Sequence, residues 1–309
     1  FQSPILNKRM DEYGGSIKKR ARLALEFLAA AREGVGPDYP IIFRLPCQRK
    51  DISDRSRIIF KLPYDETIEE GFRVEEAVAV SILLEDGGID AIGVTSAAAG
   101  YNRDIYGAPN MLIPRGLNAA TAKAVRKEVK VAVLVNGSIN DPYLAEEILM
   151  GGKADFIELG RPLAADPQFP NKAMAGNTED IRKCILCSRC VESIFRAPVG
   201  PMVCSVNPAV GKEREFEEQL KPSAQKKRVL VIGGGPAGME ASLIATARGH
   251  EVTLWEKDNK LGGQLNLAII PPGKDELSSL IRYFRFQLDR SGVKVVLNMF
   301  ATPEAILKY

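Results

Sequence analysis

The sequence lacks a large excess of charge and any long apolar run, and each absence argues against a class of function. The 309 residues include 42 lysines and arginines against 39 aspartates and glutamates, so nothing indicates a nucleic-acid-binding surface. No uninterrupted apolar run approaches the length that spans a bilayer, and no signal peptide opens the chain. We therefore expect a cytoplasmic protein with no nucleic-acid or membrane partner.

Histidine is almost absent as well. His250 is the single histidine, and its position just before a predicted strand indicates a surface residue. No histidine therefore remains for acid–base chemistry in the first half of the chain. The chain begins at Phe1 without a methionine, and we expect that it starts within a fold.

Four of the five cysteines form one motif. Cys184, Cys187 and Cys190 are each separated by two residues, and Cys204 follows after thirteen more. This spacing favours four-thiolate ligation of a [4Fe-4S] cluster, because each Cys-x-x-Cys turn points its sulfurs at one centre. A structural zinc site is the alternative, although zinc usually draws its sulfurs from two separated pairs. Disulfides fit less well, because the first three cysteines are too close for pairing and nothing indicates secretion.

Residues 1–170 alternate predicted helices and strands. Ser16 is a plausible N-cap for a helix that Gly36 ends, and its predicted core positions are Ile17, Ala21, Ala24, Phe27, Leu28, Ala31 and Val35. Further helices are predicted at about 74–85, 119–129 and 142–150, and strands at 41–45, 91–94, 131–135 and 155–159. These four βα units fit the C-terminal half of a TIM (β/α)8 barrel, with four units missing before Phe1. A half-barrel that pairs with a second copy is the alternative.

The barrel interpretation predicts an anion site where the last two strands end. Phosphate commonly binds at the loops after strands seven and eight. Here Asn136-Gly137-Ser138 and Gly160-Arg161-Pro162 follow these strands, although each could also be an ordinary glycine turn. Arg44 ends the first predicted strand and could hold the pyrimidine side of a flavin or form a structural ion pair. A polar insertion of about twenty residues follows this strand, longer than an ordinary loop, and Cys47 is expected to be a loop or core residue.

A second motif begins a Rossmann-like domain. A basic lead-in and an apolar strand run directly into Gly233-Gly-Gly235-Pro-Ala-Gly238, and a helix at 239–248 and a strand at 251–255 follow. Glu256, eighteen positions after the last glycine, can bind ribose hydroxyls and disfavours a 2′-phosphate, so NADP is not expected here. The loop 261–265, which contains Gln264, could lie along the dinucleotide. A helix at 274–290 and a strand at 293–298 complete the predicted elements, and the domain looks truncated at its C-terminus.

These motifs resemble the NADH:flavin oxidoreductases that join an old-yellow-enzyme barrel to an iron–sulfur linker and a reductase domain. The group includes 2,4-dienoyl-CoA reductases, enoate reductases and trimethylamine dehydrogenase. The resemblance covers nearly the whole chain. The matching residues outside the cysteine and glycine motifs are Ser3-Pro4, Asn7, Asp11-Glu-Tyr-Gly-Gly-Ser16, Arg20, Arg44, Asn136-Gly137, Leu159-Gly-Arg-Pro-Leu163, Ala165-Asp-Pro167, Asn207-Pro208 and Leu261-Gly-Gly-Gln-Leu265.

The resemblance implies three parts: a barrel half at 1–175, a cluster-binding linker at 176–225 and an FAD/NAD-binding domain at 226–309. It implies FMN at Arg44, Gly137, Gly160 and Arg161, the [4Fe-4S] cluster at the four cysteines, and FAD, or ADP in an amine-dehydrogenase-like member, at Gly233, Gly235, Gly238, Glu256 and Gln264. Electrons would pass from NADH through FAD and the cluster to FMN, which would reduce an activated C=C bond. The small-molecule substrate would be an enoyl thioester or an enoate, and a homo-oligomer is possible.

Several points stay open at the level of sequence. The family's histidine-containing substrate motif and catalytic tyrosine would precede Phe1, so no catalytic residue is assigned, and we expect the chain to be inactive alone. Tyr101 and Tyr106 could touch substrate, although solvent-facing loop positions are the default. The cysteine spacing is closer to that of the amine dehydrogenases, so outward electron flow from an amine is an alternative. A non-catalytic electron-transfer or zinc-stabilised binding module is the third hypothesis.

Overall fold

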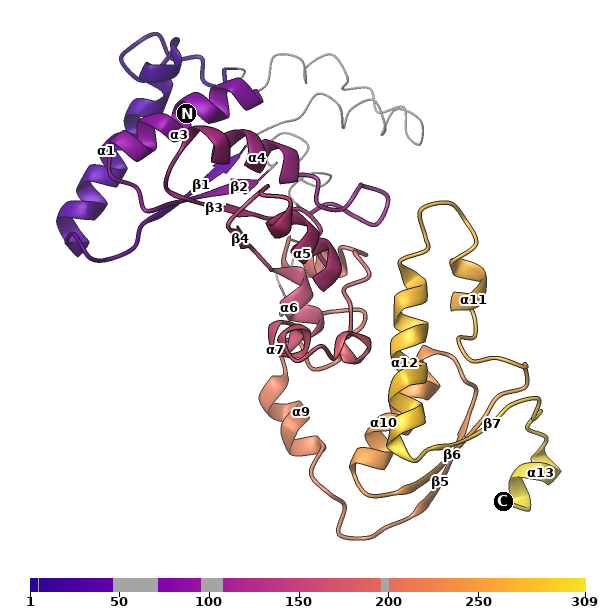
Figure 1. The fold of residues 1–309 in the computed structure, drawn as a ribbon. Coiled ribbons are helices and arrows are strands. Elements are labelled where there is room, and N and C mark those ends of the chain that lie inside the picture. The colour runs from indigo at the N-terminus through magenta and orange to yellow at the C-terminus, as the bar shows by residue number, and fades with distance from the viewer. Residues whose placement is uncertain (5, 47–71, 96–107, 196–199) are drawn as a thin grey trace. The chain divides into compact units, whose positions relative to one another are not determined.

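A computed structural model describes residues 1–4, 6–46, 72–95, 108–195 and 200–309 of the protein (Figure 1). The chain forms two compact units, Phe1–Leu159 and Gly160–Tyr309. Cys47, Tyr101, Tyr106 and nearly all of the polar insertion lie outside the described residues. In the part of the chain that is described, no helix is both long and apolar enough to cross a membrane.

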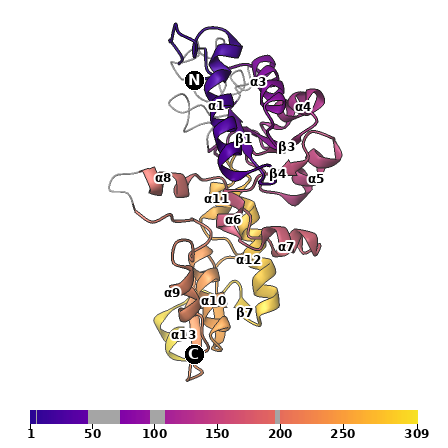
Figure 2. The same cartoon turned by 90° about the vertical axis from the view of Figure 1, so that its left-hand side faces the viewer.

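The first unit is built on a parallel sheet whose four strands lie side by side in chain order. The strands are β1 (Ile42–Pro46), β2 (Ala91–Thr95), β3 (Ala132–Val135) and β4 (Phe156–Ile157), and the helices are α1 (Ile17–Val35), α3 (Val74–Asp86), α4 (Ala119–Glu128) and α5 (Pro142–Met150). Figure 2 shows α3, α4 and α5 following one another along the sheet. Parallel strands in chain order with intervening helices are the expected βα units, although β4 is shorter than predicted.

The core of the first unit lies between this sheet and its helices. All five residues of β2 are buried, as is typical of a strand covered on both faces. Helix α1 contributes Ala21, Ala24 and Leu28 at helical spacing, and α3 contributes Ala77, Val80 and Leu84. The buried Arg20 of α1 forms an ion pair with Glu76 of α3, so this arginine of the N-terminal motif joins two helices.

Three of the predicted core positions of α1 are wrong. Phe27 is 67% exposed, Val35 is 47% exposed and Ala31 is also exposed. Successive helical residues are about 100° apart, and the buried stripe passes through Ala24 and Leu28. Phe27 stands beside this stripe and faces solvent.

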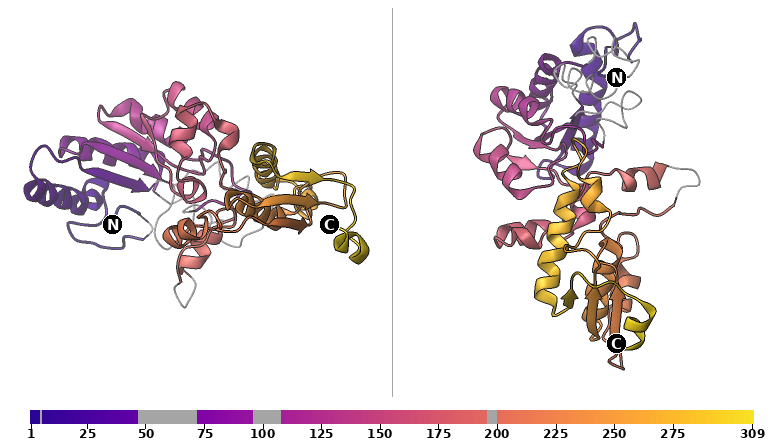
Figure 3. Two further views of the ribbon diagram at one scale, coloured as in Figure 1. Left: turned by 90° about the horizontal axis from the view of Figure 1, so that it is seen from below. Right: turned by 90° about the vertical axis from the view of Figure 1, so that its right-hand side faces the viewer.

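The second unit contains a parallel sheet of β5 (Arg228–Ile232), β6 (Glu251–Trp255) and β7 (Lys294–Val296), again in chain order. Helices α10 (Pro236–Ala247) and α12 (Leu277–Ser291) connect these strands and pack side by side (Figure 3). Helix α12 faces the core with Leu280, Ile281, Phe284 and Leu288, and it ends at Gly292, whose φ of 80° is left-handed. The strand–turn–helix–strand order is the one predicted for a nucleotide-binding unit.

Short elements precede this sheet. They are α6 (Arg161–Ala165), α7 (Phe169–Met174), the 3-10 helix η3 (Thr178–Asp180), α8 (Arg189–Phe195) and α9 (Glu213–Gln219). The remaining short helices are α11 (Leu265–Ala268) and α13 (Pro303–Leu307). The cysteines therefore lie on loops and helix ends rather than on strands, and they belong to the same compact unit as the glycine motif.

Candidate functional site

In the first unit, a chain of polar side chains lies where the strands end. The amide of Asn118 donates to Asn136 Oδ1 over 3.0 Å, and the amide of Asn136 donates to Glu158 Oε2 over 2.7 Å. Gly137 has a φ of 120°, and its carbonyl oxygen accepts the Gly116 N–H over 2.7 Å. A Cβ at Gly137 would lie 3.1 Å from Asn118 Nδ2, so the turn requires glycine for both conformation and space.

Arg44 lies on β1 at the same side of the sheet as Glu158. Its side chain is exposed, and Nη2 is 3.5 Å from Thr95 Oγ1. Arg44 pairs with Gly93 in the sheet register, and a Cβ at Gly93 would collide with Glu158 Oε1. Paired residues of neighbouring strands project to one face. An arginine, a carboxylate and amides therefore share one face at the strand ends.

Sequence reasoning missed Glu158 and Asn118. The available signal for Glu158 was a charged residue directly after a strand, the same signal that singled out Arg44. Asn118 stands at the N-cap of α4, but its side chain makes no capping hydrogen bond. Nothing in the sequence alone indicated that Asn136 would join them.

In the second unit, the four cysteines line one pocket together with Arg161, Ser188 and Ser205. All four are outside any disulfide. Cys184 is buried and Cys187 is exposed, with its Sγ 3.3 Å from Ser205 Oγ. Within the described ranges, no group of three or more His, Cys, Asp or Glu side chains is arranged to hold a metal ion. The structure thus gathers the predicted ligands around one pocket without showing a metal site.

The backbone of the cysteine loop is unusual. Leu186 and Ser188 have φ of 52° and 60°, a left-handed conformation that residues other than glycine adopt rarely. The Leu186 N–H donates to Cys184 Sγ over 3.4 Å. Alternating right- and left-handed residues turn successive N–H groups inward, and such nests occur at many iron–sulfur sites.

Burial and one arginine act in opposite directions on these thiols. Burial raises the pKa of Cys184 to about 11, and the nearby Arg161 charge opposes this rise. Burial also raises the pKa of Cys190, again against Arg161. Arg161 begins α6, and its Nη1 lies 3.5 Å from Ser188 Oγ, so its position is beside the cysteines. A Cβ at the preceding Gly160 would meet no atom within 4 Å.

The predicted dinucleotide turn connects β5 to α10. Gly233 has a φ of 99°, and a Cβ at Gly238 would collide with the Gly233 carbonyl oxygen. The Gly234 N–H donates to Glu256 Oε2 over 2.6 Å, and the Asp258 N–H donates to Glu256 Oε1 over 2.9 Å. Glu256 is only 5% exposed, so its carboxylate holds the turn through these two hydrogen bonds from a buried position.

The second glycine loop packs directly on this turn. The Gly262 N–H donates to the Gly234 carbonyl over 2.9 Å. A Cβ at Gly263 would lie 3.0 Å from the Gly235 Cα, whereas a Cβ at Gly235 would meet nothing within 4 Å. Gln264 is exposed at the start of α11. The two loops therefore form one backbone surface with open space above Gly235.

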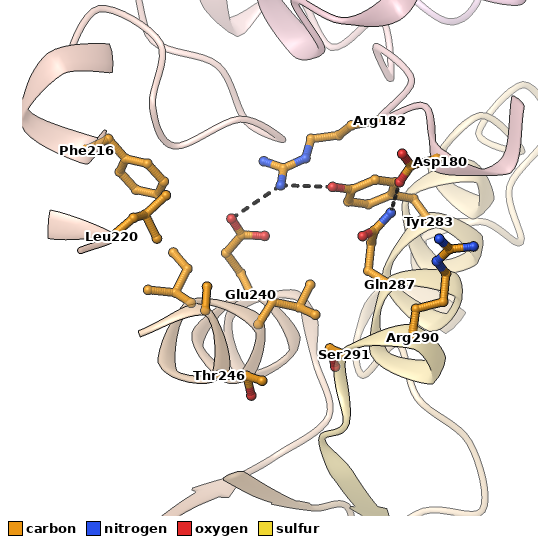
Figure 4. A pocket seen from close by; sticks show the side chains of 13 residues that line it. Asp180, Arg182, Phe216, Leu220, Glu240, Thr246, Tyr283, Gln287, Arg290 and Ser291 are labelled. Carbon is orange, nitrogen blue, oxygen red and sulfur yellow. Dashed lines mark hydrogen bonds and ion pairs between the residues drawn. The ribbon is translucent and has the colours of Figure 1, made fainter. Parts of the chain in front are cut away.

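A larger cavity, of about 570 Å³, lies beside α10 and α12 (Figure 4). Its polar wall includes Arg182, Glu240 and Tyr283, and its apolar wall includes Phe216 and Leu220 of the α9 region. Arg182 Nη2 lies 3.1 Å from the Tyr283 hydroxyl and 3.5 Å from Glu240 Oε1. Sequence reasoning did not single out these residues.

The parallel βα units, the cysteine pocket and the glycine turn define a class of cofactor-dependent oxidoreductases. The family model described as "NADH:flavin oxidoreductase / NADH oxidase family" matches residues 1–180, and the model "FAD dependent oxidoreductase" matches residues 228–280. The chain belongs to the NADH:flavin oxidoreductase / NADH oxidase family. Its flavin cofactors are FMN in the first of these regions and FAD in the second.

Curated relatives match over almost the whole chain. A metal reductase of Desulforamulus reducens is 39% identical over 99% of this chain and 42% of its own length. An NADH oxidase of Thermoanaerobacter brockii is 37% identical over 99% and 44%, and a cinnamate reductase of Clostridium sporogenes is 34% identical over 100% and 45%. The chain thus spans less than half the length of these relatives.

Solved structures agree with this assignment. A complex of 2-naphthoyl-CoA reductase with 2-naphthoyl-CoA has a TM-score of 0.85 and 32% identity, covering 99% of this chain and 43% of that one. Histamine dehydrogenase from Rhizobium sp. 4-9 has a TM-score of 0.83 and 27% identity, covering 99% and 42%. The same fold thus occurs in a reductase and in an amine dehydrogenase.

Proposed function

We propose that the protein is an NADH-dependent flavin reductase of an activated carbon–carbon double bond, such as that of an enoyl thioester or an enoate. The dinucleotide turn would hold FAD, which would supply acceptance of hydride from NADH. The four cysteines would hold a [4Fe-4S] cluster, which would supply one-electron transfer, and FMN would supply hydride for the substrate. The observation that carries the proposal is that one compact unit, Gly160–Tyr309, contains both the four-cysteine pocket and the dinucleotide turn. Similarity to a cinnamate reductase and a 2-naphthoyl-CoA reductase supports this substrate class.

The donor set of the cysteine pocket fits the cluster. Four thiols outside any disulfide, an inward-turned loop at Leu186 and Ser188, and the cationic Arg161 suit an anionic group with thiolates at four corners. A cluster takes one thiolate at each of four irons, so its cysteines stand further apart than those around a single ion. The wider separation of cysteines around a cluster is compatible with four sulfurs that line one pocket but form no site for a single metal ion.

The glycine turn fits the pyrophosphate of FAD. Open space above Gly235 and the start of α10 leave room for an anion beside backbone N–H groups, and helix N-termini favour negative charge. Glu256 already accepts two backbone N–H groups, but each carboxylate oxygen can accept more than one donor. We therefore propose that Glu256 binds the ribose of FAD, with Gln264 at the edge of the same surface.

For FMN, we propose Arg44 and Gly137 as ligands within the first unit. Gly160 and Arg161 belong to the second unit and stay predictions from the sequence. Arg44 supplies a fixed positive charge on the face that also bears Glu158, and Gly137 brings backbone close to an anion. We also propose that the chain divides into parts at 1–175, 176–225 and 226–309 and that it forms a homo-oligomer.

Amine oxidation with outward electron flow is the second candidate. The similarity to histamine dehydrogenase and the narrow cysteine spacing both favour it. The two candidates use the same cysteine pocket and dinucleotide turn, so neither site alone decides between them.

Turnover distinguishes the two candidates. This chain spans less than half the length of its relatives and is expected to be inactive alone, so the assay uses a full-length, cofactor-loaded protein that contains it. We expect that protein to oxidise NADH anaerobically only when an acceptor such as cinnamate or an enoyl-CoA is present, with one substrate reduced per NADH. Methylated amines or histamine with an artificial electron acceptor provide the matched assay. Amine-dependent dye reduction without NADH-dependent enoate turnover would establish the second candidate, and zinc in place of iron would leave the non-catalytic module.

A further inference from the structure

Arg182 stands two residues before the first cysteine and joins four segments of the second unit. Its guanidinium Nη1 donates to the Val206 carbonyl over 2.9 Å, two residues after Cys204. Its Nη2 lies 3.1 Å from the Tyr283 hydroxyl of α12 and 3.5 Å from Glu240 Oε1 of α10. Its backbone N–H donates to Asp166 Oδ2 over 2.9 Å.

The charge of Arg182 is held firmly in this position. The side chain is only 16% exposed, and its guanidinium lies 5.0 Å from the centre of the Tyr283 ring. Burial alone would lower the pKa of Arg182, but Tyr283 and Glu240 outweigh burial and leave that pKa above its ordinary value. Asp166 also accepts Lys172 Nζ over 2.8 Å, so the backbone before Cys184 is itself anchored.

The segments that Arg182 joins lead to both cofactor sites. On one side lie the two arms of the cysteine pocket, at Cys184 and Cys204. On the other side lies Glu240 on α10, four residues after Pro236, the first residue of the helix that follows the dinucleotide turn. Few other side chains of similar length could reach three acceptors in a fork, as a planar guanidinium does.

We propose that Arg182 is a positioning residue that fixes the cysteine pocket relative to helix α10. In this way Arg182 sets the rate of electron transfer between FAD and the cluster. This inference rests on the proposed function, because it requires both groups to be bound. Arg182 is not proposed to contact FAD or the cluster. Instead, Arg182 acts through Val206 and Glu240.

The cavity beside Arg182 makes this role testable. About 570 Å³ of space adjoins the guanidinium, so a shorter side chain at this position leaves the contacts empty instead of drawing neighbours together. In Figure 4 the interactions of Arg182 with Glu240 and Tyr283 cross this cavity. We call the contacts of Arg182 with Val206, Glu240 and Tyr283 the Arg182 clamp. A loss of this clamp therefore loosens the cysteine loop against α10, while the cysteine pocket and the dinucleotide turn keep their own residues.

The test compares Arg182→Gln and Arg182→Lys with Arg285→Gln, which alters an exposed arginine of α12. Iron, sulfide and FAD content and the cluster spectrum are measured first. NADH then reduces the flavin in a single turnover, and bleaching of the cluster is followed by stopped flow. We expect unchanged content and spectrum for all three, with cluster reduction severalfold slower in Arg182→Gln than in wild type.

Further variants keep the inference open to refutation if Arg182→Gln does not fold. Tyr283→Phe and Glu240→Gln each remove one partner and keep the arginine, and each is expected to slow cluster reduction less than Arg182→Gln does. The proposal fails if the rate of cluster reduction is that of wild type in Arg182→Gln, or in both Tyr283→Phe and Glu240→Gln. A lower melting temperature at a wild-type rate would show that these contacts only stabilise the fold. A wild-type protein without cluster or FAD would instead overturn the proposed function.

Discussion

At the scale of single residues, the four cysteines share one pocket but differ in access to solvent. Cys184 is 8% exposed and therefore buried, whereas Cys187 is exposed. Thiolate and not thiol is the form that reacts and that binds metal. In the metal-free pocket, burial disfavours the thiolate forms of Cys184 and Cys190, and metal binding to these two thiols releases their protons.

This difference predicts the order of alkylation in metal-free protein. With the pKa of Cys184 raised to about 11, only about one Cys184 in a thousand is a thiolate at pH 8. We expect iodoacetamide to modify Cys187 first, with Cys184 modified slowly and faster as pH rises toward 11. Peptide mass spectrometry over time at two pH values measures this order. Equal rates at pH 8 would contradict the burial of Cys184.

The dinucleotide turn allows a prediction from two of its glycines. A Cβ at Gly238 collides with backbone, whereas a Cβ at Gly235 meets nothing within the chain. Gly238→Ala should therefore lower the free energy of unfolding by about 1–3 kcal/mol, the usual cost of overpacking. Gly235→Ala should unfold like wild type and lose FAD affinity only.

Urea unfolding of the FAD-free protein and titration with FAD separate the two effects. Unaltered FAD binding by Gly235→Ala would place the pyrophosphate elsewhere, and unaltered stability of Gly238→Ala would contradict the close approach of α10 to β5.

At the scale of elements, the ion pair between α10 and the cysteine loop predicts a pH dependence. Burial raises the pKa of Glu240 above its ordinary 4.5, and Arg182 opposes the rise. A raised folded-state pKa means that the neutral carboxyl stabilises the fold below about pH 4.5. This contribution is lost as pH rises through the folded-state pKa.

Glu240→Gln should therefore gain stability relative to wild type as pH rises above 4.5. Unfolding free energies of both proteins across this range, measured without cluster, check the sign. A difference that falls with increasing pH would show that Arg182 dominates over burial at this carboxyl.

Most elements follow from local signals in the sequence. Apolar periodicity located α1, α3, α4 and α5, and strand–glycine–helix order located β5 and α10. The error at Phe27 arose because periodicity does not say where a buried stripe ends. The β4 strand, with two residues, is shorter than predicted because its hydrogen bonds depend on a neighbour and not on its own residues.

The candidate sites were predictable where ligands are close in sequence. The cysteine motif and the glycine motif carry their geometry in their spacing, and the structure gathers each around one surface. Contacts between distant segments were not predictable. The Arg182 clamp joins residues up to 101 positions apart, and Glu158 meets Asn136 across 22 positions.

At the scale of the whole molecule, we propose that a single chain combines flavin and iron–sulfur chemistry. The family assignment establishes the flavin part, since the chain belongs to the NADH:flavin oxidoreductase / NADH oxidase family. The cysteine pocket is the part on which the electron relay depends. A [4Fe-4S] cluster in this pocket would support a reductase or dehydrogenase with one-electron steps. A zinc ion would support a non-catalytic module that the metal stabilises.

The most direct measurement is iron, acid-labile sulfide, zinc and flavin analysis of anaerobically purified protein, together with a visible spectrum. We expect about four irons and four sulfides per chain, with absorption that dithionite bleaches. Replacing Cys184 with serine should remove the iron, while serine at Cys47, outside the motif, provides the control. Zinc without sulfide in the wild-type protein would contradict the electron relay.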